Sequence, residues 1–214
     1  ELGFEAQLST TITLSAVASV GQYIYANNPT YQRFSDSYSI NEQDLTSITA
    51  GATAPMTTYL KNYKIANGPQ QGFSLGIQYR DPKSWWIGAT GNYMAAKYLD
   101  PAPYRRTSAI WGQSAGLFTE EFVRDYLAQE KFSDEFMLNI NVGKTFRMGK
   151  YFMGISANIN NVLDNRDYVT GGFEQTRIGN LDVLNDRPGY QQVFAPRYWY
   201  DRGRSYFINV FFRF

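Results

Sequence analysis

The sequence predicts an all-β chain that forms a segment of an antiparallel, up-and-down transmembrane β-barrel. About seven segments alternate apolar residues with polar residues or glycine, at the period of two that is typical of strands. The connections between these segments are alternately short and long. The aromatic share of 17% is high and the charged share of 18% is low for a soluble domain. Short turns on one side and long loops on the other are the asymmetry expected of a membrane barrel.

The first two predicted strands are Leu2–Leu8 and Thr13–Tyr25. Each places apolar side chains on one face and small or polar side chains on the other. The short turn Ser9–Thr11 joins them, and the long connection Asn27–Gly68 follows the second strand. We therefore expect an antiparallel pair whose turn and outgoing loop lie at opposite ends.

Four further strands are predicted in the middle of the chain, as two pairs that are each joined by a short turn. The positions opposite the apolar ones hold mostly Gly, Ser, Thr, Asn and Gln, which is typical of the wet or plugged interior of a barrel. The strands are Gly72–Arg80, Trp85–Tyr98, Phe136–Phe146 and Tyr151–Asn160, the turns are Asp81–Ser84 and Arg147–Lys150, and the long connection between the pairs is Leu99–Glu135.

The last predicted strand is Arg204–Phe214, which the long connection Leu163–Arg204 precedes. One of its faces is wholly apolar, and the other mixes polar groups with two aromatic rings. A half-buried strand of a soluble sandwich would alternate in the same way, so this strand alone does not decide the class. The regular alternation of turn lengths along the whole chain favours the membrane barrel. We expect the seven strands to form one contiguous, curved, antiparallel wall.

A helix is predicted within one long connection, in the sequence TEEFVRDYLAQEKF. Thr119 is the expected N-cap, and Glu120 and Glu121 suit the first turn. An apolar stripe would pack this helix on the loops or on the barrel rim, and contact with a ligand is the alternative. The stripe consists of Phe122, Val123, Tyr126 and Leu127.

Composition excludes several classes of chemistry. The chain holds no cysteine and no histidine, which removes disulfides, a thiol nucleophile, a histidine base and zinc ligation by nitrogen or sulfur. We therefore expect no catalytic residues, no cofactor and no enzyme activity. The formal net charge of +1 gives no basic stripe for nucleic acid. The sequence contains no run of 18 apolar residues, so it predicts no transmembrane helix.

Two groups of carboxylates are candidate calcium ligands, because calcium binds oxygen and needs no histidine. The first group is Asp182 with Asp186, and the second is Asp36, Glu42 and Asp44. Neither group has EF-hand spacing. The sequence therefore predicts solvated loop charge, and no metal site.

Two segments near the end of the chain resemble the last strands of a TonB-dependent outer-membrane receptor. They are ISANINNVLDNRDYVTGGF and APRYWYDRGRSYFINVFFRF. The first carries the family-like motif residues Asn161, Leu163, Asp164 and Tyr168. The second carries a Pro-Arg-aromatic approach and a Gly-Arg-x-Tyr-Phe entry to the last strand. Upstream, the sequence from Asn67 is similar to the Oar-like and SusC-like members of this family.

The resemblance implies a barrel of 22 strands around an N-terminal plug. About seven strands cannot close such a barrel, so residues 1–214 are expected to be its C-terminal portion, without the plug or the preceding strands. The implied location is the outer membrane of a Gram-negative cell, with the C-terminus on the periplasmic side. The implied partners are the TonB energy-coupling complex through the plug, outer-membrane lipid, the barrel-assembly machinery and a SusD-like surface lipoprotein lid.

The function that the resemblance implies is TonB-dependent uptake of a large or scarce ligand, such as a glycan, a peptide or a chelate. The alternative is a structural barrel within an envelope export or assembly complex. Aromatic planes and guanidinium groups in the long loops are the expected ligand contacts, and packing of the loops against one another is the alternative role for each. These residues are Tyr104, Arg105, Arg106, Trp111, Arg197, Tyr198, Trp199 and Tyr200.

The apolar parity of the last strand also resembles the C-terminal signal that the outer-membrane assembly machinery reads. A polar segment after Phe214 would lie where the assembly machinery is expected to recognise the last strand and where that strand is expected to close the barrel. The residues of this expected assembly signal are Tyr206, Ile208, Val210, Phe212 and Phe214.

Overall fold

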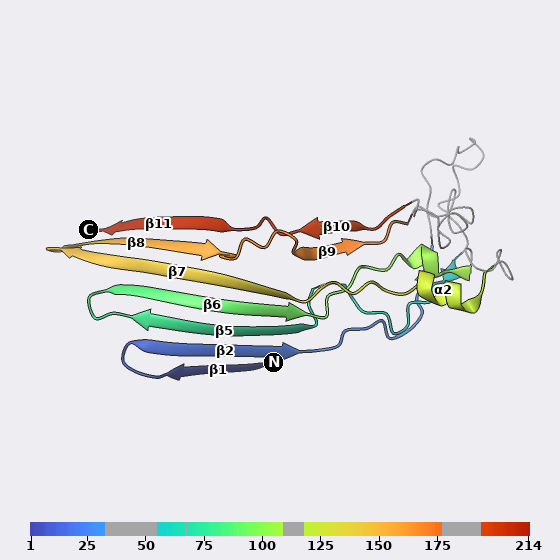
Figure 1. Cartoon of the computed structure of the whole chain (residues 1–214), viewed down its shortest axis with the longest axis horizontal. Coiled ribbons are helices and arrows are strands. Elements are labelled where there is room, and N and C mark those ends of the chain that lie inside the picture. Colours follow the sequence, from blue (N-terminus) through green and yellow to red (C-terminus); the bar gives the residue numbers. More distant parts are fainter. Residues whose placement is uncertain (33–54, 67, 109–117, 177–193) are drawn as a thin grey trace, which may run out of the picture.

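The structure, a computed structural model, describes residues 1–32, 55–66, 68–108, 118–176 and 194–214. Its main element is one seven-stranded antiparallel sheet in which neighbouring strands follow one another in sequence order (Figure 1). The prediction of an all-β, antiparallel wall is confirmed in this respect. The strands are β1 (Leu2–Gln7), β2 (Ile12–Val20), β5 (Gln71–Arg80), β6 (Trp85–Ala95), β7 (Glu135–Met148), β8 (Tyr151–Asn160) and β11 (Ser205–Arg213).

The register of the sheet keeps the two faces separate from strand to strand. Phe4 pairs with Ala16, Ala16 with Leu75, Leu75 with Gly91, and Gly91 with Leu138. Every member of this row lies on the apolar face. The next row belongs to the polar face and consists of Glu5, Ser15, Gly76, Thr90 and Asn139. The alternation within each strand therefore becomes two continuous surfaces, one apolar and one polar.

The three short connections between paired strands are tight turns at one end of the sheet. In the β5–β6 turn the Asp81 carboxylate accepts hydrogen bonds from the Lys83 backbone N–H at 2.7 Å and the Tyr79 hydroxyl at 3.0 Å. In the β1–β2 turn the Ser9 hydroxyl oxygen accepts a bond from the Ile12 N–H at 3.0 Å. The β7–β8 turn needs Gly149, whose φ is +62°. The predicted short turns are confirmed, and all three lie at the end opposite the loops (Figure 1).

Two of the predicted strands end earlier than expected. The second was predicted to continue to Tyr25, but β2 stops at Val20. Beyond Val20, the Gln70 side chain donates to the Tyr23 carbonyl at 2.9 Å, in place of the backbone hydrogen bond that a regular strand pair would make. The fourth was predicted to continue to Tyr98, but β6 stops at Ala95 because Ala96 has a φ of +55°. Both corrections fall where the sheet gives way to the loops.

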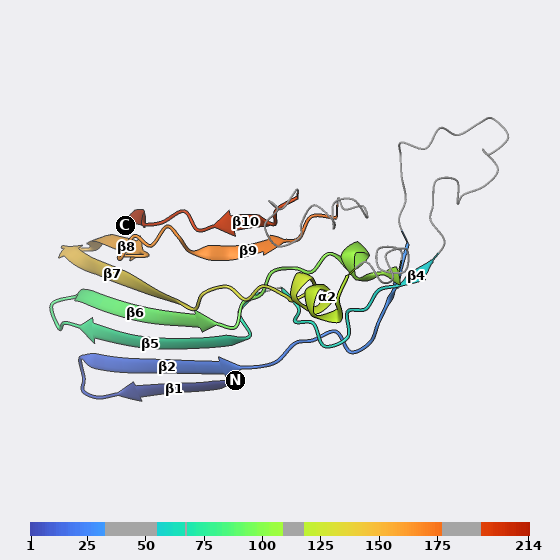
Figure 2. The ribbon, with the colours of Figure 1, turned by 45° about the vertical axis from the view of Figure 1, so that its right-hand side comes forward.

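The long connections contain short elements of their own. Two small hairpins form, β3 (Thr30–Tyr31) with β4 (Met56–Thr57) and β9 (Val169–Phe173) with β10 (Arg197–Tyr200). The second hairpin lies beyond the ends of β8 and β11 (Figures 1 and 2). Reading Leu163–Arg204 as loop throughout was therefore wrong for these two strands. A short 3-10 helix, η2, spans Pro103–Arg106.

The predicted helix is confirmed as α2, which spans Glu120–Tyr126. Thr119 caps it, since its hydroxyl accepts the Phe122 N–H at 3.2 Å. The helix ends sooner than the sequence TEEFVRDYLAQEKF predicted. Phe132, at the end of that sequence, is buried beneath the loops. Within the described ranges, no helix combines the length and the apolar character needed to cross a membrane.

The well-buried apolar side chains lie at the loop end. They come from loop residues and from the loop-side ends of strands, and they form a small core there. This core consists of Leu60, Ala95, Leu99, Ala102, Phe132 and Tyr168. Among the described residues no second sheet packs on either face of the seven-stranded sheet. The sheet is therefore a single layer, and the loops pack into a separate body at one end of it (Figure 2).

Two aromatic rings on the polar face lie over glycines of the neighbouring strand. Trp86 pairs with Gly143, and Phe211 pairs with Gly154. A Cβ atom at either glycine would overlap the facing ring. Glycine is therefore required at both positions for the rings to lie flat against the sheet.

We expect Gly154→Ala to lower the free energy of unfolding by about 1–3 kcal/mol, because the added methyl displaces the Phe211 ring. Gly72→Ala is the matched control, since a Cβ at Gly72 meets no atom within 4 Å. Urea unfolding of both variants measures the difference. Equal stability of the two variants would show that the ring contact is not tight.

Candidate functional site

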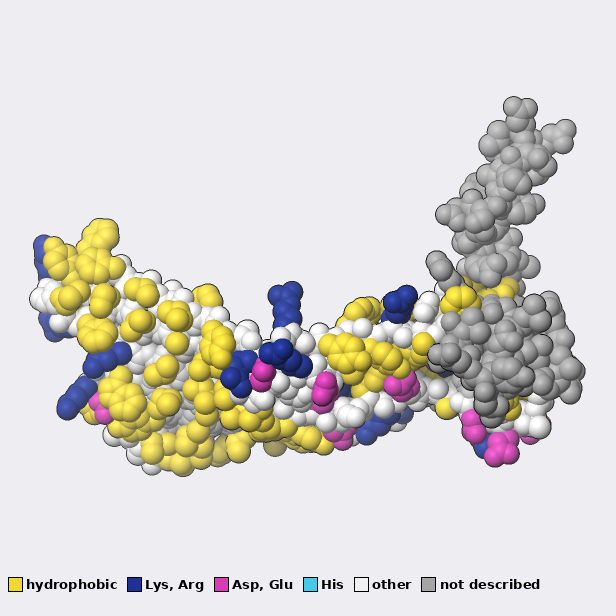
Figure 3. All heavy atoms as spheres, turned by 45° about the horizontal axis from the view of Figure 1, so that its top comes forward, with side chains coloured by type: hydrophobic (Ala, Val, Ile, Leu, Met, Phe, Trp, Pro, Cys, Tyr) yellow, Lys and Arg dark blue, Asp and Glu magenta, His cyan; other side chains and the backbone are white. Residues whose placement is uncertain are grey.

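The apolar face of the seven-stranded sheet is uncovered. Leu75 is 65% exposed and Ile208 is 68% exposed, although both lie in the middle of regular strands. Hydrophobic side chains gather over the sheet in Figure 3. Soluble monomers rarely expose an apolar patch larger than a few hundred Å². Other exposed members of this face are Leu2, Phe4, Ile77, Ile155 and Val210.

The residues of the expected assembly signal belong to this face. Tyr206 pairs with Ile159, Ile208 with Ala157, Val210 with Ile155 and Phe212 with Met153. The Phe212 ring lies 5.8 Å from the Tyr151 ring and 6.3 Å from the Phe214 ring. The five side chains are all exposed. The structure therefore places them in one apolar stripe along β11.

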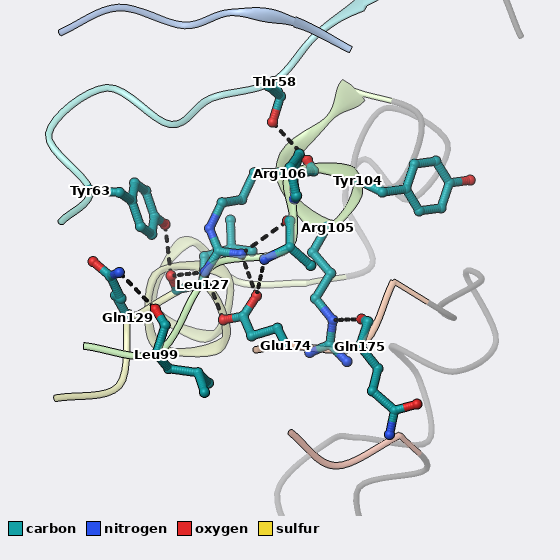
Figure 4. Close-up of polar contacts among 12 residues, drawn as sticks. Thr58, Tyr63, Leu99, Tyr104, Arg105, Arg106, Leu127, Gln129, Glu174 and Gln175 are labelled. Carbon is teal, nitrogen blue, oxygen red and sulfur yellow. Dashed lines mark hydrogen bonds and ion pairs between the residues drawn. The ribbon is translucent and has the colours of Figure 1, made fainter. Parts of the chain in front are cut away.

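At the loop end, the side chain of Arg106 is the centre of a buried polar cluster (Figure 4). It forms an ion pair with Glu174, in which its Nη2 lies 2.9 Å from Oε1. The same guanidinium donates to the carbonyls of Ala102 at 3.2 Å and Leu127 at 3.0 Å. Its Cζ lies 4.5 Å from the centre of the Tyr63 ring. One side chain thus joins four segments of the loops.

The ion pair determines the charge state of this cluster. Burial alone would lower the pKa of Arg106, but the hydrogen bonds and the negative charge of Glu174 outweigh burial and raise it. Burial, together with Glu174, raises the pKa of the nearby Asp100. Arg106 therefore stays charged, and Glu174 supplies its counter-charge.

Neutral hydrogen bonds extend the cluster. Thr58 donates through Oγ1 to the Pro103 carbonyl at 2.7 Å. Gln129 donates through Nε2 to the carbonyls of Lys64 and Leu99, both at 2.8 Å. These bonds connect the segment before β5, the segment after β6 and the segment after α2. The base of the loops is consequently one hydrogen-bonded unit.

Lys97 is a second buried cation at the loop base. Its Nζ donates to the Val169 carbonyl at 2.8 Å, lies 3.3 Å from the Glu135 carboxylate, and lies 4.0 Å from the centre of the Tyr168 ring. Burial lowers the pKa of Lys97, and the negative charge of Glu135 opposes this shift. Lys97 ties the β9–β10 hairpin to the ends of β6 and β7.

The structure divides the expected ligand residues into two groups, and the first is enclosed by protein. Arg105 is buried and donates to the carbonyls of Gln175 at 3.1 Å and Phe194 at 3.2 Å. Arg106 is buried in the cluster described above. The Tyr104 ring is partly buried and lies 6.0 Å from the Tyr31 ring. Trp111 lies outside the described residues. The two arginines thus hold the loops together.

The second group lies on β10. Tyr198 faces the loop body, where its hydroxyl donates to Glu130 at 2.8 Å, and burial together with this bond raises its pKa to about 12. Trp199 and Tyr200 are each 57% exposed, and Arg197 is also exposed. These three side chains remain available to a ligand.

Phe173 completes an exposed aromatic pair that the sequence did not indicate. It lies on β9, and its ring is 5.8 Å from the Trp199 ring at an angle of 47°. Gly171 pairs with Trp199 in the register, so no side chain comes between this indole and the strand. The pair could stack against a planar or ring-shaped group.

The residues of the family-like motif connect the end of β8 to the start of β11. Asn161 has a φ of +52°, and its side chain bonds the backbone of Asn165 in both directions. The Asp164 carboxylate accepts the Arg204 N–H at 2.9 Å, and this bond and the Arg166 side chain lower the pKa of Asp164. Leu163 is exposed. The motif therefore shapes a loop that is closed by side-chain bonds.

Tyr168, the last residue of that motif, is buried against Lys97, and its hydroxyl donates to the Met94 sulfur at 3.0 Å. The described residues contain no group of three acidic side chains that could hold a metal ion. The candidate calcium ligands in the ranges 36–44 and 182–186 lie outside the described residues.

Comparisons of the chain with protein-family models, with curated proteins and with solved structures find no match.

We expect Glu174→Gln to destabilise the loop base by about 3 kcal/mol, because it leaves the buried Arg106 charge without a counter-charge. Hydrogen exchange of the amides in residues 97–107 measures this opening. Asp125→Asn is the control, since it breaks the exposed Arg124–Asp125 pair and should change little. Unchanged exchange in Glu174→Gln would mean that the ion pair does not hold the loops.

Proposed function

We propose that this chain forms part of the wall and outer loops of a TonB-dependent outer-membrane receptor, which takes up a large or scarce ligand. The observation that carries the proposal is the uncovered apolar face on a single antiparallel sheet, with tight turns at one end and long loops at the other. We propose this family because the motif around Asn161 and the last strand resemble the last strands of TonB-dependent receptors.

Physical chemistry favours lipid as the cover of the apolar face. Each Leu, Ile, Val or Phe side chain that leaves water contributes about 1.5–3 kcal/mol, and this face carries many such side chains. β5 and β8 have 10 residues each and β11 has 9, which match the length of a tilted strand that spans a bilayer. The opposite face carries Ser, Thr, Asn, Gln and Gly, which suits an aqueous or protein-filled interior.

The loop body supports a receptor role. Buried ion pairs and hydrogen bonds hold the bases of the loops together, so exposed side chains on them have fixed positions. Trp199 and Phe173 form an exposed aromatic pair on this body, and Tyr200 is a further exposed ring. Fixed aromatic planes at the mouth of a barrel are suited to capture of a ligand before transport.

The wall can be tested with brominated lipids, which quench a fluorophore in contact with acyl chains. The chain has no cysteine, so a fluorophore on a single introduced cysteine is unique within it. We expect a fluorophore on Leu75→Cys to be quenched strongly in the intact protein reconstituted into brominated phosphatidylcholine, because Leu75 lies on the apolar face.

The matched control is Ser74→Cys, one residue away on the polar face. A fluorophore there should be quenched weakly by the same lipid and more strongly by iodide added to the aqueous phase. Equal quenching of the two positions by lipid would argue against a wall with lipid on one side.

Uptake can be tested in cells that depend on the protein. We expect Trp199→Ala to slow the depletion of the ligand from the medium by about tenfold, because it removes the more exposed ring of the Phe173–Trp199 pair. Mass spectrometry of oligosaccharides, peptides and metal chelates in the medium measures depletion, with a deletion strain to identify the ligand.

Tyr59→Ala is the control for this experiment, because Tyr59 is a similarly exposed aromatic residue on another loop. Depletion should also stop when a protonophore removes the proton gradient that drives TonB. A deletion strain that depletes every compound as fast as the parent would contradict uptake and favour a structural role in the envelope.

A further inference from the structure

Charge is distributed unevenly along the sheet. The turn end carries six cationic side chains, which are Arg80, Lys83, Lys144, Arg147, Lys150 and Arg213. Among the described residues of this end, Asp81 is the one acidic side chain, and its carboxylate is occupied by the turn. Lys and Arg side chains stand out from this end of the molecule in Figure 3. The chain as a whole has a formal net charge of only +1.

The three lysines lie on the apolar face or at the turns. Lys144 pairs with Trp85 and Ile155, which places it on the apolar face. Its Nζ lies 5.1 Å from the centre of the Phe146 ring. Lys150 occupies the β7–β8 turn, where its Nζ lies 5.2 Å from the Tyr151 ring. Lys83 occupies the β5–β6 turn and is exposed.

The three arginines lie on the polar face. Arg80 pairs with Trp86, and both Arg147 and Arg213 pair with Phe152. The Arg147 guanidinium carbon lies 5.7 Å from the Phe152 ring. The three arginines thus lie on the polar face, whereas Lys144 lies on the apolar face and Lys83 and Lys150 lie in the turns.

We propose that Lys83, Lys144 and Lys150 form a binding surface for the phosphate groups of anionic phospholipids in the leaflet that the turn end contacts. This inference rests on the proposed function, since it requires lipid on the apolar face. A lysine beside an aromatic ring at the edge of an apolar surface can lay its stem on that surface and keep its ammonium among the headgroups.

Charge complementarity favours this occupant. Lys144 and Lys150, each beside an aromatic ring, and Lys83 in the neighbouring turn attract negative surface charge. The one carboxylate among the described residues of this end, that of Asp81, accepts hydrogen bonds from the Tyr79 hydroxyl and the Lys83 backbone N–H. A lysine ammonium is a compact, mobile charge that suits headgroups with no fixed orientation. The arginines face the other side of the sheet, where lipid would not reach them.

The test uses the intact protein with a fluorophore on Ile155→Cys, which lies directly opposite Lys144 on the apolar face. The vesicles contain phosphatidylcholine and phosphatidylglycerol at equal mole fractions, and only one of the two is brominated in each preparation. We expect brominated phosphatidylglycerol to quench at least about three times as strongly as brominated phosphatidylcholine at low salt. The ratio should fall towards one at high salt.

Charge-matched variants identify the groups responsible. Replacing Lys83, Lys144 and Lys150 by Gln should reduce the quenching ratio to about one. Replacing Arg80, Arg147 and Arg213 by Gln removes the same charge and should leave the ratio high. A ratio near one in the parent protein, or loss of preference in the arginine variant alone, would overturn the inference.

The fluorophore on Leu75→Cys is carried through every variant as a separate reading. If it is quenched by either brominated lipid, the wall is in contact with lipid and the Ile155 ratio tests the inference alone. If neither brominated lipid quenches it in the parent protein, lipid does not contact the apolar face, and the proposed function is contradicted together with the inference that rests on it. Should the triple lysine variant not assemble, Lys150→Gln alone changes a turn residue and should lower the ratio in part.

Discussion

One constraint governs this molecule: the apolar side chains of seven neighbouring strands lie on one uncovered face, and removing such a face from water is strongly favourable. Because the register joins Phe4, Ala16, Leu75, Gly91 and Leu138 in one row, a change in any one strand alters the whole surface. The surface has no protein cover among the described residues. If lipid covers this face, the sheet is the wall of a membrane barrel; if a second sheet covers it, the sheet is one layer of a soluble sandwich. The tight turns at one end and the polar residues of the opposite face favour the barrel wall.

The loops meet a different constraint, because much of their polar backbone lies outside the regular ladder of the seven-stranded sheet. The Arg106 guanidinium donates to two carbonyls and to Glu174, while Gln129 and Thr58 satisfy further carbonyls. A buried charge is costly to desolvate, and this one is tolerated because the Glu174 carboxylate and two carbonyls bind the guanidinium. Through Lys97, the loop base is also joined to β9, the strand that carries the exposed Phe173 ring beside Trp199.

The strands could be predicted from the sequence because the alternation of apolar and polar residues is visible within each short segment. The strand ends could not, since the left-handed φ of Ala96 and the side-chain bonds of Gln70 carry no periodic signal. The β9 strand was missed because the stretch from Val169 to Phe173 is short and contains two glycines. The sequence predicts Arg106 as a loop guanidinium that contacts a ligand or packs the loops, but the partner that it binds, Glu174, is 68 residues away. Pairing over that distance leaves no trace in a single sequence.

The rings over Gly143 and Gly154 bear on how the sheet finds its register. A slip of one residue would turn apolar side chains to the polar face, and parity alone forbids it. A shift of two residues keeps every apolar side chain on the apolar face, so the alternation does not exclude it. It would, however, set Trp86 against Asn141 or Thr145 in place of Gly143, and Phe211 against Phe152 or Ser156 in place of Gly154. The close fit of each ring over its glycine thus favours the observed register over a two-residue shift, which the alternation of side chains alone does not distinguish.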